Sequence, residues 1–383
     1  MDKEIKKTSL KKSKGASLNI SITTTNVIDD IETEWRFLEN LGVQSPGQNF
    51  DFIRTWLGIL DIKPENQYFS VLKIDNVPII IMALEATKMM GVKTLMPFTK
   101  SQVGVEAPLI NAKAMVKFSE QEQKSLWQAL IKSFKGFDLM YIPYVPDDAL
   151  YSQLGISAPA DMLYRSEFES WEQCNREQRT RSRRKHDKQH SAKLNALGDV
   201  SFEEISADNK EIDNILSLMF KQRAQRFKIL GIKNPFEEEK HRQFYYKIMK
   251  SNGDMKVSLH VLRVNKEIVA IRYNIIHQKK MFCLISSMSE NIKMQAGSPG
   301  KQNLLRVMQT IFDAGIRVYD MGAGLTDEKR HWCNSLTALR HFYIPLTFKG
   351  YIISILHRII KTLRFHIKNS KKLGGFLKKL RRT

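Results

Sequence analysis

Residues 298–329 read SPGKQNLLRVMQTIFDAGIRVYDMGAGLTDEK, and the order of local signals in this stretch decides the fold. Ser298 is a preferred helix N-cap, Pro299 suits the first turn of a helix, and Gly300 lets a ligand approach the backbone. Apolar residues then recur at helical spacing, so one face of the predicted helix packs on a sheet. The amino-terminal end stays free, and its unpaired backbone amides favour an anion such as a diphosphate.

The same stretch continues from the helix into a strand and a glycine-rich loop. Gly315 is expected to end the helix, and residues 317–320 are expected to form a short strand. This strand delivers Asp320, Gly322 and Gly324 to the edge of a loop. A plain helix cap in an ordinary helix-to-strand connection is the other interpretation of the Ser-Pro-Gly turn.

The preceding segment makes the pattern more specific. Residues 256–264, 268–276 and 280–288 are rich in Val, Ile, Leu and Phe and are separated by polar turns, which predicts an antiparallel meander of three strands. Residues 209–227 and 237–250 carry apolar residues at i, i+3 and i+4, which predicts two helices before the meander. Two helices, a meander, a diphosphate turn, a helix and further strands resemble the GNAT acyltransferase fold.

The last third of the chain is also similar to the CelD-type acetyltransferases associated with bacterial cellulose biosynthesis. That family carries an SPG turn, a helix and a D-x-G-x-G loop followed by a lysine, here residues 298–300, residues 320–324 and Lys329. An arginine-rich segment, here residues 179–193, and a tryptophan-containing N-terminal region are similar as well. The family usually has a tyrosine before the lysine, whereas Glu328 stands here, so any role of that tyrosine does not carry over.

The resemblance implies acetyl-CoA or another acyl-CoA as co-substrate, with no metal. The turn would hold the CoA diphosphate, and a splayed gap beside the meander would supply a backbone amide for the thioester carbonyl. The expected cofactor-binding residues are Ser286, Ser287, Ser298, Pro299, Gly300 and Lys301. The general base stays open among Asp320, Glu328 and His331.

An acceptor would need its own binding groups. The candidate substrate-binding residues are Arg183, Arg184, Gly322, Gly324 and Lys329. Arginine grips phosphate or carboxylate with two parallel hydrogen bonds, although a solvated helix is the simplest interpretation of the arginine-rich segment. Lys329 either binds an anion or is simply exposed. Asp320 either takes part in catalysis or caps the glycine loop.

The first half of the chain shows a weaker version of the same plan. Residues 71–75 and 261–265 share one pattern, and each is followed by an apolar strand. A helix-like run over residues 125–134 also ends at a glycine before the next strand, but no SPG turn precedes it. We therefore expect an α/β (α+β mixed) fold with tandem GNAT-like domains, each a mostly antiparallel sheet flanked by helices, as in FemABX-like proteins. Coincidental similarity between the two hairpins is the alternative.

Four segments are predicted from this plan. Residues 1–19 are a basic disordered arm, and residues 20–165 are a degenerate GNAT-like domain. Residues 166–348 are the GNAT acyltransferase domain, and residues 349–383 are a basic amphipathic tail.

Composition agrees with a two-domain enzyme. The chain has 383 residues with 42% hydrophobic content, which is enough for two cores and excludes general disorder. The three cysteines are dispersed without metal-like spacing, so we expect them to be reduced. The N-terminal lysines are not followed by an apolar segment, and no apolar run approaches the ~20 residues of a bilayer span. These features predict a cytoplasmic protein that could lie peripherally on the inner membrane.

The net charge of +21 is concentrated in three short segments. Residues 1–15 hold six lysines against two acids, residues 176–193 hold eight basic residues against two acids, and residues 345–383 hold eleven basic residues and no acid. The rest of the chain is close to neutral, so the charge does not indicate a broad nucleic-acid-binding face. In the last segment, apolar and basic residues alternate at near-helical spacing. Such a helix could lie on an anionic leaflet or pack on the first domain.

The sequence thus predicts an acyl-CoA-dependent N- or O-acyltransferase whose acceptor belongs to envelope or exopolysaccharide metabolism. The acceptor is implied by the resemblance alone. One alternative is a FemABX-like transferase that uses aminoacyl-tRNA to extend a peptidoglycan precursor. The other is a non-catalytic, membrane-associated scaffold that has lost activity. The sequence indicates no oligomeric state.

Overall fold

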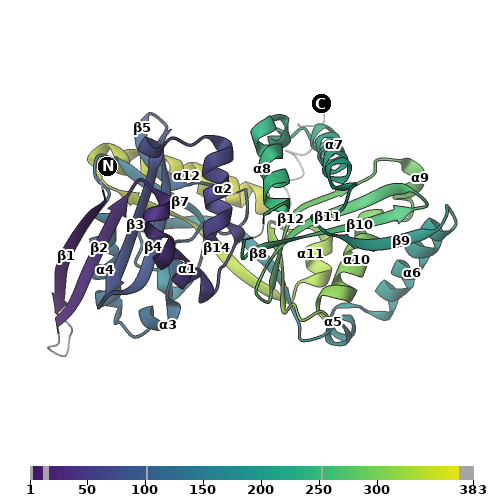
Figure 1. Ribbon diagram of the computed structural model, residues 1–383, viewed down its shortest axis with the longest axis horizontal. Coiled ribbons are helices and arrows are strands. Elements are labelled where there is room, and N and C mark those ends of the chain that lie inside the picture. The colour runs from purple at the N-terminus through teal and green to yellow at the C-terminus, as the bar shows by residue number, and fades with distance from the viewer. Residues whose placement is uncertain (1–2, 12–16, 101, 252, 371–383) are drawn as a thin grey trace. The chain divides into compact units, whose positions relative to one another are not determined.

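The computed structural model describes residues 3–11, 17–100, 102–251 and 253–370 (Figure 1). Contacts within the chain divide it into two units, which we call the first unit (Met1–Met162 with Thr337–Thr383) and the second unit (Leu163–Leu336). The first change of unit falls close to the predicted boundary at residue 165. The chain returns to the first unit at Thr337, before the predicted boundary at residue 348, because β14 (Ser335–Pro345) joins the first unit's sheet.

The sheet of the first unit has one parallel pair among antiparallel neighbours. Its strands β5 and β7 run parallel, with helix α4 (Glu120–Ile131) between them in the chain, and the other neighbours pair antiparallel. The order is β1 (Glu4–Lys11), β2 (Ser17–Thr25), β3 (Gln67–Ile74), β4 (Val77–Met89), β5 (Val92–Pro97), β7 (Leu139–Pro146) and β14, with β6 (Leu109–Ile110) on β4.

The sheet of the second unit repeats this plan, with β9 in the place that β2 has in the first unit. Its parallel pair is β12 and β13, with helix α10 (Pro299–Ile311) between them in the chain. The order is β9 (Val200–Ile205), β10 (Lys256–Val264), β11 (Glu267–His277), β12 (Lys280–Met288), β13 (Val318–Ala323) and the part of β8 (Ile156–Glu167) that begins at Leu163.

Both units also share a register shift in one hairpin, formed by β3 and β4 in the first unit and by β10 and β11 in the second. The register shifts between Leu72 and Lys73 in one unit and between Leu262 and Arg263 in the other. Bulges are specific local features, so their occurrence at equivalent places strengthens the match of the two sheets. The mixed α/β fold with tandem GNAT-like sheets is confirmed, and so are the meander and the two helices before it.

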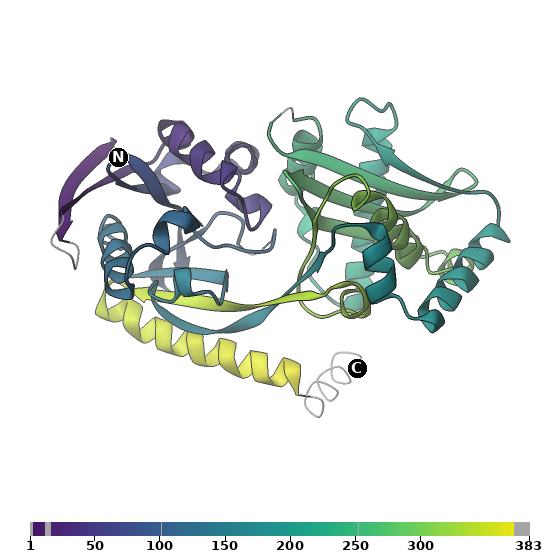
Figure 2. The same cartoon turned by 90° about the horizontal axis from the view of Figure 1, so that it is seen from below.

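Helices cover the sheets of both units. Figure 1 shows α7 and α8 on one face of the second unit's sheet, and α10 with α5 on the other. Figure 2 shows α12 beside β14 in the first unit, where α12 also contacts β5 and β7. Besides α4 and α10, the described α-helices have these bounds: α1 (Glu32–Asn40), α2 (Phe50–Leu60), α3 (Ala112–Met115), α5 (Trp171–Gln178), α6 (Arg181–Asn195), α7 (Ile212–Leu230), α8 (Glu239–Met249), α9 (Ile292–Gln295), α11 (Asp327–Trp332) and α12 (Phe348–Asn369).

Three segments differ from their predicted form or extend beyond the described residues. Residues 4–11, expected in a disordered arm, form β1 because they pair along the length of β2. The basic segment expected as one exposed helix is split at Arg179, and the Thr180 hydroxyl accepts a hydrogen bond from the Arg183 amide to begin α6. The tail forms the predicted helix through Asn369, whereas residues 371–383 lie outside the described part.

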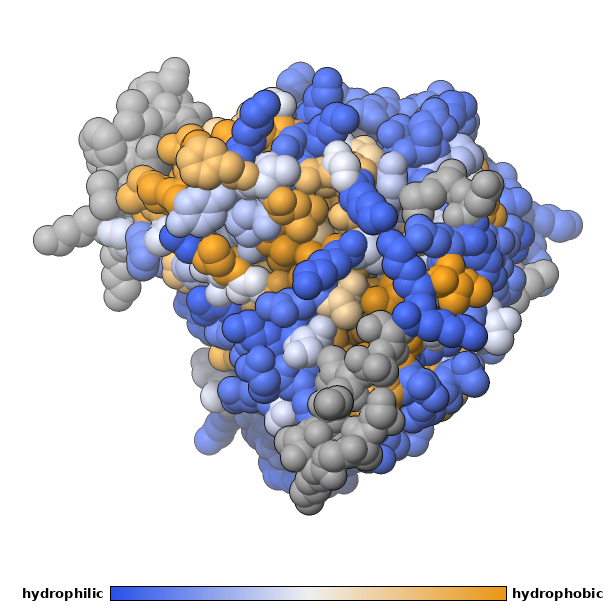
Figure 3. Space-filling model, turned by 90° about the vertical axis from the view of Figure 1, so that its left-hand side faces the viewer, coloured by the Kyte–Doolittle hydropathy of each residue, from blue (hydrophilic) through white to orange (hydrophobic). Residues whose placement is uncertain are grey.

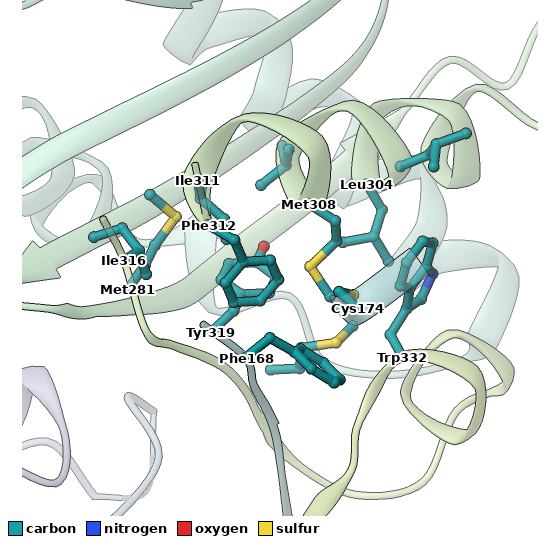
Figure 4. Close-up of a cluster of buried hydrophobic side chains, with 13 residues drawn as sticks. Phe168, Cys174, Met281, Leu304, Met308, Ile311, Phe312, Ile316, Tyr319 and Trp332 are labelled. Carbon is teal, nitrogen blue, oxygen red and sulfur yellow. The ribbon is translucent and has the colours of Figure 1, made fainter. Parts of the chain in front are cut away.

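The apolar face of α10 is the centre of the second unit's core. The predicted stripe is buried and packs against strand residues such as Met281 and Tyr319 (Figure 4). Each fully buried side chain of this size contributes about 1.5–3 kcal/mol. This packing fixes the direction of α10, and therefore the place where its amino-terminal end lies. The stripe consists of Leu304, Leu305, Met308, Ile311 and Phe312.

The close approach of α12 to its own unit depends on a glycine. A Cβ atom on Gly350 would lie 1.7 Å from the carbonyl oxygen of Asp138, which is backbone and cannot rotate away. We expect Gly350→Ala to lower the free energy of unfolding by about 1–3 kcal/mol in urea denaturation, because the helix must shift. Gly58→Ala in α2 is the matched control, since nothing lies within 4 Å of a Cβ there. Equal stability of the two variants would contradict this account.

Candidate active site

The turn before α10 has a different geometry from a simple capped helix. Ser298 has a left-handed backbone (φ 49°), and its hydroxyl makes no capping hydrogen bond. Its carbonyl instead accepts from the amides of Lys301 and Gln302, both at 3.0 Å. The expectation that the Ser298 side chain caps the helix is therefore wrong. The left-handed residue redirects the backbone, so that Pro299 begins the helix.

Helix α6 is held directly against this turn. A Cβ atom on Gly297 would lie 2.5 Å from the Leu194 side chain, so the turn and α6 are in close contact. The buried Gln302 donates from Nε2 to the Asp187 carbonyl in α6 at 3.0 Å. The Asp187 carboxylate in turn pairs with Arg183 at 3.4 Å. The start of α10 thus positions the arginine-rich helix.

Near this helix start, two predicted site residues, Arg183 and Lys301, act electrostatically on a third, His331. Partial desolvation, and then the nearby positive charge of Arg183, lower the pKa of His331, and Lys301 lowers it further. The pKa of His190 is lowered in the same way, first by desolvation and then by Lys301. Arg183 comes from α6, Lys301 from α10 and His331 from α11. We call Arg183, Lys301, His190 and His331 the cationic cluster.

Arg184 has a different use from its neighbour Arg183. Its guanidinium donates to the carbonyl of Arg179 at 2.6 Å and to that of Asn175 at 3.3 Å. These carbonyls lie at the end of α5, where helix carbonyls lack partners within the helix. Arg184 therefore satisfies the end of the preceding helix, which its place in the sequence did not reveal.

A gap opens between β12 and β13 beyond their paired ends. In the described residues, their pairing ends at Phe282 and Asp320, although β12 continues to Met288. The register of β12 with β11 shifts near Leu284, where an extra residue bends the strand. Ten residues, including α9, separate the end of β12 from the start of α10.

Two predicted cofactor residues lie on β12 along the gap. Ser287 is buried and donates from its hydroxyl to Oε1 of Gln222 at 2.8 Å. The Ser286 carbonyl accepts from Arg223 at 3.2 Å. Both contacts come from α7, which covers the opposite face of the sheet from α10. The Ser287 hydroxyl and the Ser286 carbonyl thus tie this strand to α7.

The carboxylate of Asp320 lies at the closed end of the gap. It is 5% exposed and accepts from Nε of Arg165 and from the Gly322 amide, both at 2.8 Å. The second contact caps the glycine loop, as one of the two sequence interpretations expected. Asp320 therefore has a structural use whether or not it also exchanges a proton.

Glu328 is connected to the helix start through an arginine that the sequence analysis missed. Arg272 is buried in β11 and donates to the Glu328 carboxylate at 3.0 Å and to the Gly300 carbonyl at 3.3 Å. A buried guanidinium needs such a paired charge, because an unpaired one is strongly unfavourable. The available signal was one arginine inside the apolar run of residues 267–276.

Lys329 is a structural lysine in this chain. It is 9% exposed, and its ammonium group donates to the carbonyls of Gly322, Ala323 and Gly324 at 3.1, 2.7 and 2.8 Å. These bonds use the three donors of the ammonium group. The expected role in binding an anionic acceptor has no support in this geometry, since the lysine closes the glycine loop on itself.

The cysteines have the character of buried thiols. Burial raises the pKa of both Cys174 and Cys333 to about 12. A nucleophilic cysteine needs the opposite shift, because the thiolate is the reactive form. All three cysteines are free and at least half-buried, in agreement with the expected reduced state.

The equivalent gap in the first unit is filled by its own chain. The parallel pairing of β5 and β7 ends at Leu95 and Met140, and the following loop carries buried residues such as Phe98 and Val105. The Glu106 amide in this loop donates to the carbonyl of Tyr144 in β7 at 3.3 Å. The cavity left there has a volume of about 30 Å³, enough for one or two waters.

Removing the Lys329 ammonium group should affect stability first. We expect Lys329→Met to lower the free energy of unfolding by about 2 kcal/mol, because three loop carbonyls lose their donors. Arg330→Met is the matched control, since the neighbouring Arg330 side chain is 62% exposed. Chemical denaturation followed by circular dichroism measures both. A fully stable Lys329→Met protein with impaired substrate binding would instead indicate a direct role in binding.

Comparison with known proteins agrees with this geometry. Residues 181–330 match the family model described as an acetyltransferase (GNAT) domain. The matched range includes α6, the gap and three of the four residues of the cationic cluster, and it ends one residue before His331. No curated protein sequence matches the chain.

Solved structures match over most of the chain at low sequence identity. FemX has a TM-score of 0.53 and 11% identity, covering 80% of this chain and 93% of that one. The C-terminal DUF2156 domain of a protein described as a lysylphosphatidylglycerol synthetase, from Agrobacterium fabrum, has a TM-score of 0.52 and 9% identity, covering 86% and 95%. A conserved protein of unknown function from Bacteroides thetaiotaomicron has a TM-score of 0.50 and 14% identity, covering 84% of this chain and 98% of that one. At these identities the matches establish the fold alone.

Proposed function

We propose that the second unit binds an acyl-CoA and transfers its acyl group to an amine or hydroxyl acceptor. The observation that carries this proposal is that Gln302 holds α6, and with it Arg183, against the start of α10, where Lys301 lies. This helix start follows the strand β12, whose pairing with β13 ends at Phe282. The two cations and the positive end of the helix dipole suit a diphosphate. A gap between strands suits the extended pantetheine arm that follows it.

The reaction needs an acceptor that loses a proton and a thioester carbonyl that gains negative charge. The acceptor oxygen or nitrogen forms a bond to the carbonyl carbon, the C–S bond breaks, and the CoA thiolate takes up a proton. Backbone amides of β12 beyond Phe282 would stabilise the oxyanion, since β13 no longer pairs with them. Asp320 is our candidate for proton transfer, because it lies where the gap closes. Glu328 then serves mainly to pair with Arg272.

We further propose that the acyl group is acetyl and that the enzyme is of the CelD-like type, with an envelope or exopolysaccharide acceptor. This finer assignment depends on the SPG turn, the D-x-G-x-G loop and the lysine that follows it. The exposed basic side chains of α6 favour one competing function, aminoacyl transfer from tRNA, because they would also suit RNA phosphates. The two functions differ in the donor that binds.

Calorimetry of acetyl-CoA binding to the full chain tests the donor. We expect Arg183→Gln and Lys301→Gln each to weaken binding about tenfold or more, because each removes a charge-assisted contact to the diphosphate. Lys185→Gln is the matched control, because this residue is exposed on the same helix. Gly300→Trp should abolish binding by covering the helix start.

Other outcomes would redirect the assignment. A folded wild type that ignores acetyl-CoA but is retained on aminoacyl-tRNA would favour the competing transferase. A folded chain that binds neither donor would favour the non-catalytic scaffold.

The histidines of the cationic cluster give a second test through pH. Their pKa values lie below the ordinary value of 6.5, so both rings are mostly neutral at pH 7 and gain charge as the pH falls or when an anion binds. We therefore expect acetyl-CoA binding near pH 6 to take up protons. The double variant His190→Gln with His331→Gln should take up fewer protons on binding acetyl-CoA. Calorimetry in buffers of different ionisation enthalpy measures this number of protons. Equal uptake would place the diphosphate elsewhere.

A further inference from the structure

Helix α12 packs on the first unit with a side that holds small and polar residues beside Ile353. Gly350 and Ser354 are buried, and His357 is half-buried with its Nδ1 3.0 Å from the Tyr343 hydroxyl. One turn further on, Lys361 is half-buried, and this desolvation lowers its pKa. These four residues recur at i, i+4, i+7 and i+11, so they form one face of the helix. An ordinary surface helix would place its apolar residues there.

The opposite face of α12 is apolar and open to solvent. Its residues recur at helical spacing, and their exposed fractions run from 42% to 76%. Figure 3, which views the end of the molecule where α12 begins, shows exposed apolar side chains in orange between blue hydrophilic ones. A continuous apolar face of this kind marks an interaction surface. We call it the apolar stripe: Phe348, Ile352, Leu356, Ile359 and Leu363.

The charges around the apolar stripe limit what can cover it. On the helix, Arg358 and Arg364 lie on the two flanks between the stripe and the buried face, about 120° to either side of the centre of the stripe. Residues 345–383 hold eleven basic residues and no acid. A second copy of the same segment would bring like charges together, which is unfavourable. An anionic surface would be attracted along the length of the helix.

The length and polarity of α12 exclude one way of meeting a membrane. Within residues 3–11, 17–100, 102–251 and 253–370, no helix combines the length and the apolar character that crossing a bilayer requires. A helix with an apolar stripe and basic borders lies in the interface plane, with the stripe among the acyl chains and the cations at the headgroups. The anchoring face is also presented outward, because the polar face already packs on the protein.

We propose that α12 binds the surface of an anionic lipid bilayer through the apolar stripe. Arg358 and Arg364 meet the headgroups on either side of it. This inference does not depend on the acyl donor, because the stripe belongs to the first unit and the cationic cluster to the second.

Flotation of the full chain with lipid vesicles tests the proposal. We expect binding to phosphatidylcholine vesicles that contain phosphatidylglycerol and much weaker binding to phosphatidylcholine alone. Ile359→Gln with Leu363→Gln should reduce binding by about tenfold or more, and so should Arg358→Gln with Arg364→Gln. Ile229→Gln with Ile232→Gln is the matched control, because these residues are similarly exposed at the end of α7. The control should bind like the wild type.

Three results would overturn the proposal. The first is a wild type that does not float with anionic vesicles. The second is unchanged binding of Ile359→Gln with Leu363→Gln, which would assign the attraction to basic residues alone. The third is a wild type that sediments as a dimer and does not bind vesicles, together with an Ile359→Gln with Leu363→Gln variant that sediments as a monomer. This result would assign the stripe to a second copy. Acetyl-CoA binding by the same variants should stay unchanged, so this test is separate from that of the proposed function.

Discussion

The packing of α10 against its sheet is the constraint on which the second unit depends. The buried apolar face of α10 fixes the orientation of this helix, and this orientation places its amino-terminal end on the side where β12 and β13 separate. The same helix holds α6 through Gln302 and the close contact at Gly297, and its Gly300 carbonyl accepts a hydrogen bond from Arg272. A hydrophobic interface thus determines where the charged groups meet.

Much of this unit could be predicted from periodicity and turn signals. The meander, its preceding helices and α10 are local patterns, and each repeats within a few residues. The side-chain roles were harder, because they depend on partners far away in the sequence. Arg184 and Arg183 are neighbours in one basic run, yet the first satisfies α5 and the second reaches the cationic cluster. Composition alone cannot separate them.

Lys329 and Arg272 also show that sequence position alone does not predict the role of a side chain. Lys329 stands at a motif position, which favoured a binding role, but the carbonyls of the glycine loop surround its ammonium group. Arg272 stands in an apolar strand, which gave little reason to consider it, yet it links Glu328 to the helix start. Burial decides both cases, and burial of a long polar side chain is a property of the whole fold.

The two units show how one sheet plan can differ in use. Both have a parallel pair whose strands separate, and both place a helix between those strands in the chain. In the first unit a loop with buried apolar residues occupies the separation, whereas the second unit keeps unpaired strand edge there. Filling such a gap exchanges a possible binding site for additional core.

The position of β14 has a consequence for how the chain is made. This strand completes the first unit's sheet by pairing with β7, although about two hundred residues separate them in the sequence. A ribosome that has released β1 to β7 has therefore produced a sheet whose last edge is still open. The second unit is contained within one continuous stretch and can finish first, so the part of the protein that emerges earlier is the part that is completed later.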